Sequence, residues 1–132
     1  MGHGTDNATV YKTLLFTLYI PGALCIHTYP QVDLEAVDNH GYTALHCAAR
    51  DGYDTIVVQL LQAKANIEAV DNNGYTALHC AAASGHNTIV GQLLQAKANP
   101  TAVTKNGQTA LQIAEQHGNQ DVVQRLRQVH SP

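Results

Sequence analysis

The sequence has little positive charge, few cysteines and no long apolar run. Its 132 residues include seven Lys and Arg against ten Asp and Glu, which gives a formal net charge of −3. A nucleic-acid-binding domain normally carries a basic stripe, so nucleic acid is not an expected partner. Three cysteines, an odd number, do not indicate a disulfide framework. Free thiols fit a reducing compartment, so we expect a cytoplasmic protein, with the nucleus or secretion as alternatives.

One apolar stretch, residues 13–26, follows a single Lys12. It is too short to span a bilayer and is interrupted by Pro21 and Gly22. It also lacks the basic segment and the small-residue cleavage site of a signal peptide. We interpret it as a buried helical layer, and a membrane is then not an expected partner. The alternative is a targeting element in a secreted or membrane-associated protein.

Motifs that carry catalysis are also missing. The sequence contains no Gly-rich phosphate loop, no G-x-S-x-G elbow and no H-E-x-x-H helix. His46-Cys47 and His79-Cys80 lie 33 residues apart and lack the closely spaced ligand pairs of zinc sites. We therefore expect no enzymatic activity, no metal and no cofactor. Both cysteines are interpreted as small buried residues.

What the sequence does contain is a repeat. Residues 37–69 and 70–102 are two nearly identical copies, and a diverged third copy from Val103 keeps the same frame. Gly41, Gly74 and Gly107 mark that frame. A fixed period of 33 residues is typical of stacked-repeat proteins, in which each unit is buried by its neighbours.

Each copy predicts a turn followed by two short helices. Asp38–Gly41 has the composition of a tight turn, and we expect Asp38 and Asp71 to brace their own turns. Thr43 is an expected N-cap for a helix that runs from Ala44 to about Arg50 and ends at Gly52. A second helix is expected from about Asp54. Its apolar stripe comprises Ile56, Val57, Leu60 and Leu61.

The segment DNHGYTALHCAARDGYDTIVVQLLQAKANIEA resembles the ankyrin repeat, D-x-x-G-x-T-P-L-H-x-A-A-x-x-G-H-x-x-I-V-x-x-L-L-x-x-G-A. The resemblance covers residues 37–132. It implies an all-α fold, an ankyrin-repeat solenoid of helix-turn-helix units joined by β-hairpin-like turns. It also implies that the histidine of T-x-L-H is structural and hydrogen-bonds the Thr43 or Thr76 region and adjacent backbone.

We expect a single domain, 1–132, with four parts. Residues 1–36 form a degenerate N-terminal repeat or cap, 37–69 and 70–102 are full repeats, and 103–132 form a C-terminal capping repeat. The apolar character of 1–36 also fits a piece of a longer array. Lys64 and Lys97 replace the family's glycine after the second helix, and a left-handed backbone there costs about 1 kcal/mol per site.

The resemblance implies that a protein partner is held by the turn tips and the concave side of the first helices. The expected partner is a protein, and the chain is expected to be a monomer. The candidate contact residues are Asn39, His40, Tyr42, Arg50, Asp51, Asn72, Asn73, Tyr75, Ala83, Ser84, Lys105, Asn106, Gln108, Gln116 and His117. Tyr42 and Tyr75 are either interface anchors or covers for the loop of the next repeat.

A comparison of the two central copies supports this choice of surface. They differ at 40/73, 50/83, 51/84, 53/86, 54/87, 58/91, 67/100 and 68/101. The first three pairs fall on the presumed contact surface, whereas the apolar stripe is almost unchanged. We therefore expect partner specificity at His40/Asn73, Arg50/Ala83 and Asp51/Ser84, beside the paired tyrosines.

Overall fold

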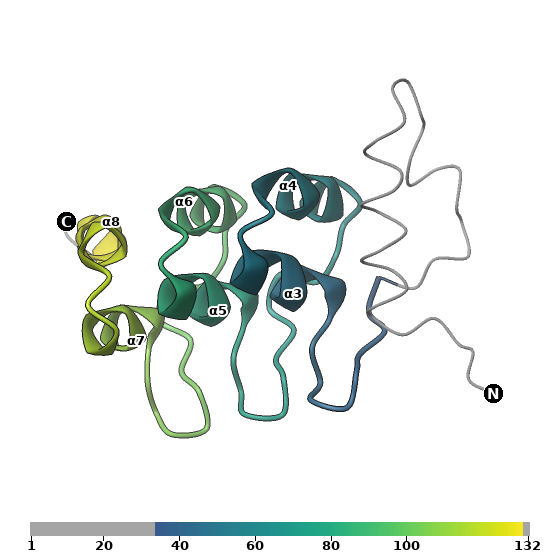
Figure 1. Cartoon of the computed structure of the whole chain (residues 1–132), viewed down its shortest axis with the longest axis horizontal. Coiled ribbons are helices and arrows are strands. Elements are labelled where there is room, and N and C mark those ends of the chain that lie inside the picture. The colour runs from purple at the N-terminus through teal and green to yellow at the C-terminus, as the bar shows by residue number, and fades with distance from the viewer. Residues whose placement is uncertain (1–33, 131–132) are drawn as a thin grey trace.

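The computed structural model describes residues 34–130 and contains three helix pairs (Figure 1). The helices are α3 (Ala44–Asp51), α4 (Asp54–Gln62), α5 (Ala77–Ser84), α6 (Asn87–Gln95), α7 (Ala110–Gln116) and α8 (Gln120–His130). Between residues 34 and 130 there is no β-strand. The predicted all-α repeat fold is therefore confirmed. Residues 1–33, which hold the apolar stretch and most of the predicted N-terminal cap, lie outside the described part.

The helix pairs stack in two layers. The first helices α3, α5 and α7 pack in sequence against one another, and so do the second helices α4, α6 and α8. Figure 1 shows the two layers one above the other, with the long turns projecting from the layer of first helices on the side away from the second helices. The turns and the first helices therefore share one side of the stack.

The core is a ladder in which the same register position is buried in every repeat. Each of these positions is at most 1% exposed: Ala48, Ala81 and Ala114; Ile56, Ile89 and Val122; Leu60, Leu93 and Leu126. Alanine in the first helices lets α3, α5 and α7 approach closely, and the larger side chains of the second helices fill the space between layers. Because no pair is stable alone, most of the stability comes from packing between neighbours.

The helix ends follow the predicted pattern. Thr43 caps α3, since its hydroxyl accepts a hydrogen bond from the backbone N–H of His46, and Thr76 caps α5 in the same way. Gly52 and Gly85 end these helices with φ of 87° and 80°, the left-handed conformation that glycine adopts without penalty. Two residues with a Cβ also adopt it. Lys64 has φ of 71° and Lys97 has φ of 75°, which confirms that both keep the left-handed backbone of the family's glycine.

The predicted structural role of the two histidines is confirmed. The ring nitrogen Nδ1 of His46 accepts the backbone N–H of Thr43 at 3.0 Å, so the proton of the neutral ring lies on Nε2. Nε2–H then donates to the carbonyl oxygen of Tyr75 in the next repeat, at 2.8 Å. His79 repeats the arrangement, with its Nε2 3.1 Å from the carbonyl oxygens of Ala102 and Gln108. Each histidine both caps its helix and ties its repeat to the following one.

Candidate partner-binding surface

The tips of the turns carry the first row of predicted contact residues, all of them exposed. These are Asn39, His40, Asn72, Asn73, Lys105 and Asn106. The Asp38 carboxylate holds the first turn by accepting the backbone N–H groups of His40 and Tyr42 at 2.9 and 3.0 Å. Asp71 does the same for the second turn, so the expectation that these carboxylates brace their own turns is confirmed.

Neighbouring turns are also bonded to each other. The backbone N–H of Asn72 donates to the carbonyl oxygen of His40 at 3.0 Å, and that of Lys105 donates to Asn73 at 3.1 Å. The Asn72 side-chain amide adds a bond to the carbonyl oxygen of Asn39 at 3.0 Å. The tips therefore form one connected rim, which would lose little conformational freedom when a partner binds.

A polar and aromatic cluster links the rim to the end of α3. The Tyr42 ring is 5.7 Å from the His40 ring, and the Arg50 guanidinium lies over Tyr42 at 5.2 Å from the ring centre. Arg50 also pairs with Asp51 at 3.1 Å, and this hydrogen bond raises the pKa of Arg50. The two side chains are 45% and 38% exposed, and such a surface pair contributes little to stability.

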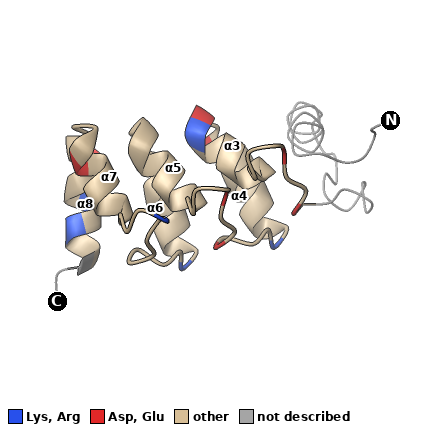
Figure 2. Cartoon of the chain, turned by 90° about the horizontal axis from the view of Figure 1, so that it is seen from below, with Lys and Arg blue, Asp and Glu red and all other residues tan. Residues whose placement is uncertain are grey.

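The second repeat presents a different chemistry at the same positions. Ala83 and Ser84 replace Arg50 and Asp51, so α5 has no charged residue, whereas red and blue lie together at the end of α3 (Figure 2). Tyr75 is partly buried against the core, with its ring 5.6 Å from that of His79. The surface thus changes from charged to neutral between the first and second repeats.

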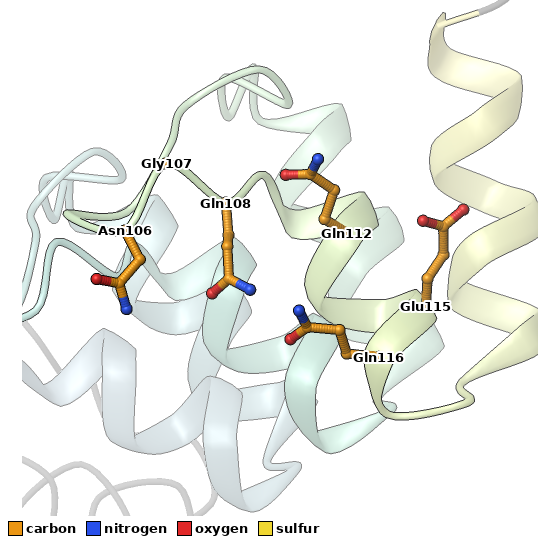
Figure 3. Close-up of a pocket in the computed structure, with 6 residues that line it drawn as sticks. All are labelled: Asn106, Gly107, Gln108, Gln112, Glu115 and Gln116. Atoms are coloured by element: carbon orange, nitrogen blue, oxygen red, sulfur yellow. The ribbon is translucent and has the colours of Figure 1, made fainter.

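The third repeat forms a polar hollow of about 490 Å³ (Figure 3). Three predicted contact residues line it: Asn106, Gln108 and Gln116. Gln112 and Glu115, which are not among the candidate contact residues and lie in the predicted capping repeat, join them. His117, also predicted, is exposed and its Nδ1 lies 2.9 Å from the carbonyl oxygen of Ile113.

The structure adds three surface residues that sequence reasoning missed. Val37, Val70 and Val103 are 50%, 55% and 54% exposed. They occupy the same register position, and the residue after each bonds through its backbone N–H to the carbonyl oxygen of Tyr42, Tyr75 or Gln108. The three valines are identical between the copies, and such identity is typical of scaffold positions as well as of contact positions. The signal available was an apolar residue repeated next to a polar turn.

Burial favours the neutral form of four groups near this surface, His46, His79, Cys80 and Tyr42. Burial is the main cause of a lowered pKa at His46 and His79, although hydrogen bonds to backbone carbonyls partly oppose it. Burial also raises the pKa of Cys80 to about 12, which keeps its thiol protonated. Burial, and then the nearby Cys80 and Asp71, raise the pKa of Tyr42. Within the described residues, no three His, Cys, Asp or Glu side chains gather closely enough to hold a metal ion.

Comparison with known families agrees with this architecture. The chain matches the ankyrin repeats family, as three copies, over residues 55–131. A single ankyrin repeat matches over residues 40–69. The chain therefore belongs to the ankyrin repeat family, whose members generally serve as protein–protein interaction modules. A comparison with curated proteins gave no match.

The membrane alternative concerns residues 13–26, outside the described part of the chain. Among residues 34–130, none of the helices has the length and apolar character needed to cross a bilayer.

Proposed function

We propose that this chain is a non-catalytic module that binds a protein partner on the turn tips and the concave side of the first helices. In this proposal it acts as a monomer in the cytoplasm, without nucleic acid, membrane or cofactor. One observation carries the proposal: between the two central copies, the exposed rim differs at 40/73 and the helix ends beside it differ at 50/83 and 51/84, while the core ladder behind them is identical.

The residues that vary between the copies at the helix ends contribute little to the stability of the fold. The Arg50–Asp51 pair is exposed and adds little stability, yet it organises Tyr42 through the guanidinium above the ring. A charged pair that adds little to the stability of the fold is a candidate for recognition. Tyrosine and arginine are also the side chains that most often dominate the energy of protein interfaces.

The chain itself supplies the test variant. Arg50→Ala with Asp51→Ser converts the end of α3 to the sequence found at the end of α5, a helix that folds in the same setting. We expect this exchange to reduce capture of a cross-linked partner, identified by mass spectrometry, at least several-fold. The melting temperature should stay near wild type. Gln62→Ala, at an exposed position in the second-helix layer, serves as the matched control.

A second variant tests the aromatic part of the surface. Tyr42→Ala with Tyr75→Ala should abolish capture. Because Tyr75 is partly buried, circular dichroism and melting must accompany this measurement. Capture that survives both the charge exchange and the tyrosine change would overturn the concave-surface proposal.

A further inference from the structure

Three valines form an exposed apolar strip beside the proposed contact surface. Val37, Val70 and Val103 occur once per repeat, and each leaves about half of its surface in water. Exposing an apolar side chain brings no stability, and single exposed valines need no explanation. Here the same side chain is exposed at the same register position three times in succession.

The spacing of the strip follows from the stack. The helices α3, α5 and α7 pack directly on one another, and packed helices lie about 8–10 Å apart. Equivalent residues in successive repeats therefore recur at roughly that distance. The backbone hydrogen bonds from Asp38 to Tyr42 and from Asp71 to Tyr75 place Val37 and Val70 beside the two tyrosine segments, and the bond from Thr104 places Val103 beside Gln108.

This spacing discriminates between partner conformations. In an extended strand, side chains on one face recur about every 6.6 Å, which is out of phase with the strip. A polyproline II helix has three residues per turn and a rise of 3.1 Å, so every third side chain recurs at about 9.3 Å. In an α-helix, side chains on one face recur at about 10.5 Å when they are seven residues apart.

The polar groups beside the strip favour the polyproline II helix over the α-helix. Polyproline II has no internal hydrogen bonds, so its carbonyl oxygens need donors, whereas those of an α-helix are already bonded. Asn39, Asn73 and Asn106 are exposed on the turn tips, two or three residues along the chain from the valines. Segments of this kind dock on aromatic-lined surfaces, and Tyr42 and Tyr75 supply such a row.

The charges on the turn tips predict where an acidic residue of a bound segment would lie. The carboxylates of Asp38 and Asp71 are engaged by backbone N–H groups of their own turns. Lys105, exposed on the third turn, is the only Lys or Arg on the three described tips. A carboxylate in the partner would therefore be attracted to the third repeat.

We propose that the valine strip binds a polyproline II segment with an apolar side chain at every third residue and an acidic residue near Lys105. This inference rests on the proposed function and specifies the partner class. One apolar side chain of the segment would lie against each valine, while the tip amides and tyrosines would donate to its carbonyl oxygens.

The test uses the full chain and labelled synthetic peptides, with affinity read by fluorescence anisotropy. The probe is a run of Leu-Pro-Pro triplets with an aspartate at either end, in two versions. Its control has the same composition with the leucines moved out of phase. We expect one probe version to bind at least tenfold more tightly than the control. Val70→Ser should weaken probe binding about tenfold, the effect of one buried valine side chain.

Matched variants separate the strip from general effects. Val129→Ser removes a valine that is 45% exposed on α8, away from the strip, and should leave affinity unchanged. Lys105→Glu should weaken binding of the acidic probe, and a probe with lysine in place of aspartate should recover it. Because Val70 is exposed, its replacement should leave the melting temperature near wild type.

Several results would overturn the inference. These are equal affinity for in-phase and out-of-phase peptides, no binding of either peptide, an unchanged affinity of Val70→Ser, or tighter binding of a helical peptide with leucine at every seventh residue. The proposed function is judged separately. If the Arg50/Asp51 exchange lowers partner capture and Val70→Ser does not, the binding surface stands and the polyproline II inference fails.

Discussion

The Nε2 atom of His46 lies 2.8 Å from the carbonyl oxygen of Tyr75, in the following repeat. On its other side the same ring completes the capping box of Thr43. One buried side chain therefore couples the start of one helix to the backbone of the next unit. In the last repeat Gln112 keeps only the capping half of this task, through a 3.0 Å bond from the Thr109 N–H to Oε1.

Replacing His46 with glutamate should separate the two tasks. A glutamate oxygen can complete the capping box as Gln112 Oε1 does, but an ionised carboxylate has no hydrogen to donate to the carbonyl oxygen of Tyr75. The buried carbonyl oxygen would lose its donor, so we expect His46→Glu to lower the free energy of unfolding by at least roughly 1–2 kcal/mol. Urea denaturation measures this. The change Gln112→Glu is the control and should alter stability little, since Gln112 is exposed and no described repeat follows.

Stability should depend on pH through both histidines. Burial lowers the pKa of His46 and His79 below the ordinary value of 6.5. As pH falls through about 6.5, the unfolded chain takes up protons that the folded chain does not, so the free energy of unfolding decreases. The loss ends at the lowered pKa of the folded state, below which both states are protonated. Above pH 7 the two neutral histidines make their full contribution to the free energy of unfolding.

Urea midpoints between pH 7.5 and 5 check this dependence. The double variant His46→Gln with His79→Gln should show a clearly shallower slope over that interval than the wild type. An equal slope in both proteins would mean that other groups cause the dependence.

Glycine should relieve the strain at Lys64 and Lys97. Both have positive φ, where a Cβ costs about 1–2 kcal/mol, and the greater freedom of unfolded glycine offsets part of the gain. We expect Lys64→Gly and Lys97→Gly each to stabilise the protein by roughly 0.5 kcal/mol, with nearly additive effects because the sites lie one repeat apart. Thermal melts test this. Lys97→Ala keeps the Cβ and should give no such gain.

Gly91 and Arg125 should be energetically coupled. A Cβ at Gly91 would lie 2.7 Å from Nη1 of Arg125, whose Nε donates to Asn87 at 2.7 Å. One repeat earlier, the same register positions hold Val58 and Gln92. We therefore expect Gly91→Val with Arg125→Gln to be more stable than the sum of the single changes predicts, and a double-mutant cycle measures this coupling. Strict additivity would show that the two positions do not interact.

Most of the fold could be predicted from local sequence. The Thr43 cap, the end of α3 at Gly52 and the apolar stripe of α4 are where the repeat pattern places them, because capping, left-handed glycine and helical periodicity act over a few residues. The left-handed backbone of Lys64 and Lys97 was also predictable, since the register with the family's glycine identifies the position.

The candidate surface was harder to predict. Exposure of Arg50 and of the turn tips could be expected from register, but the position of the Arg50 guanidinium over the Tyr42 ring depends on side-chain packing. The valine strip was not predicted, because an apolar residue that is identical in all three copies, such as Val70, is typical of a core position. Only the structure shows that this side chain is exposed.

By itself the sequence determined the repeat, its length of 33 residues, the caps and the residues that form the core, because these depend on interactions within one unit or on a position repeated between units. The tertiary structure decided what the repeats do together. Stacking joins His46 to Tyr75, links the turn tips into a rim, and aligns Val37, Val70 and Val103 along one edge. These relationships arise between residues about one repeat apart, and only packing of neighbouring units brings such residues into contact.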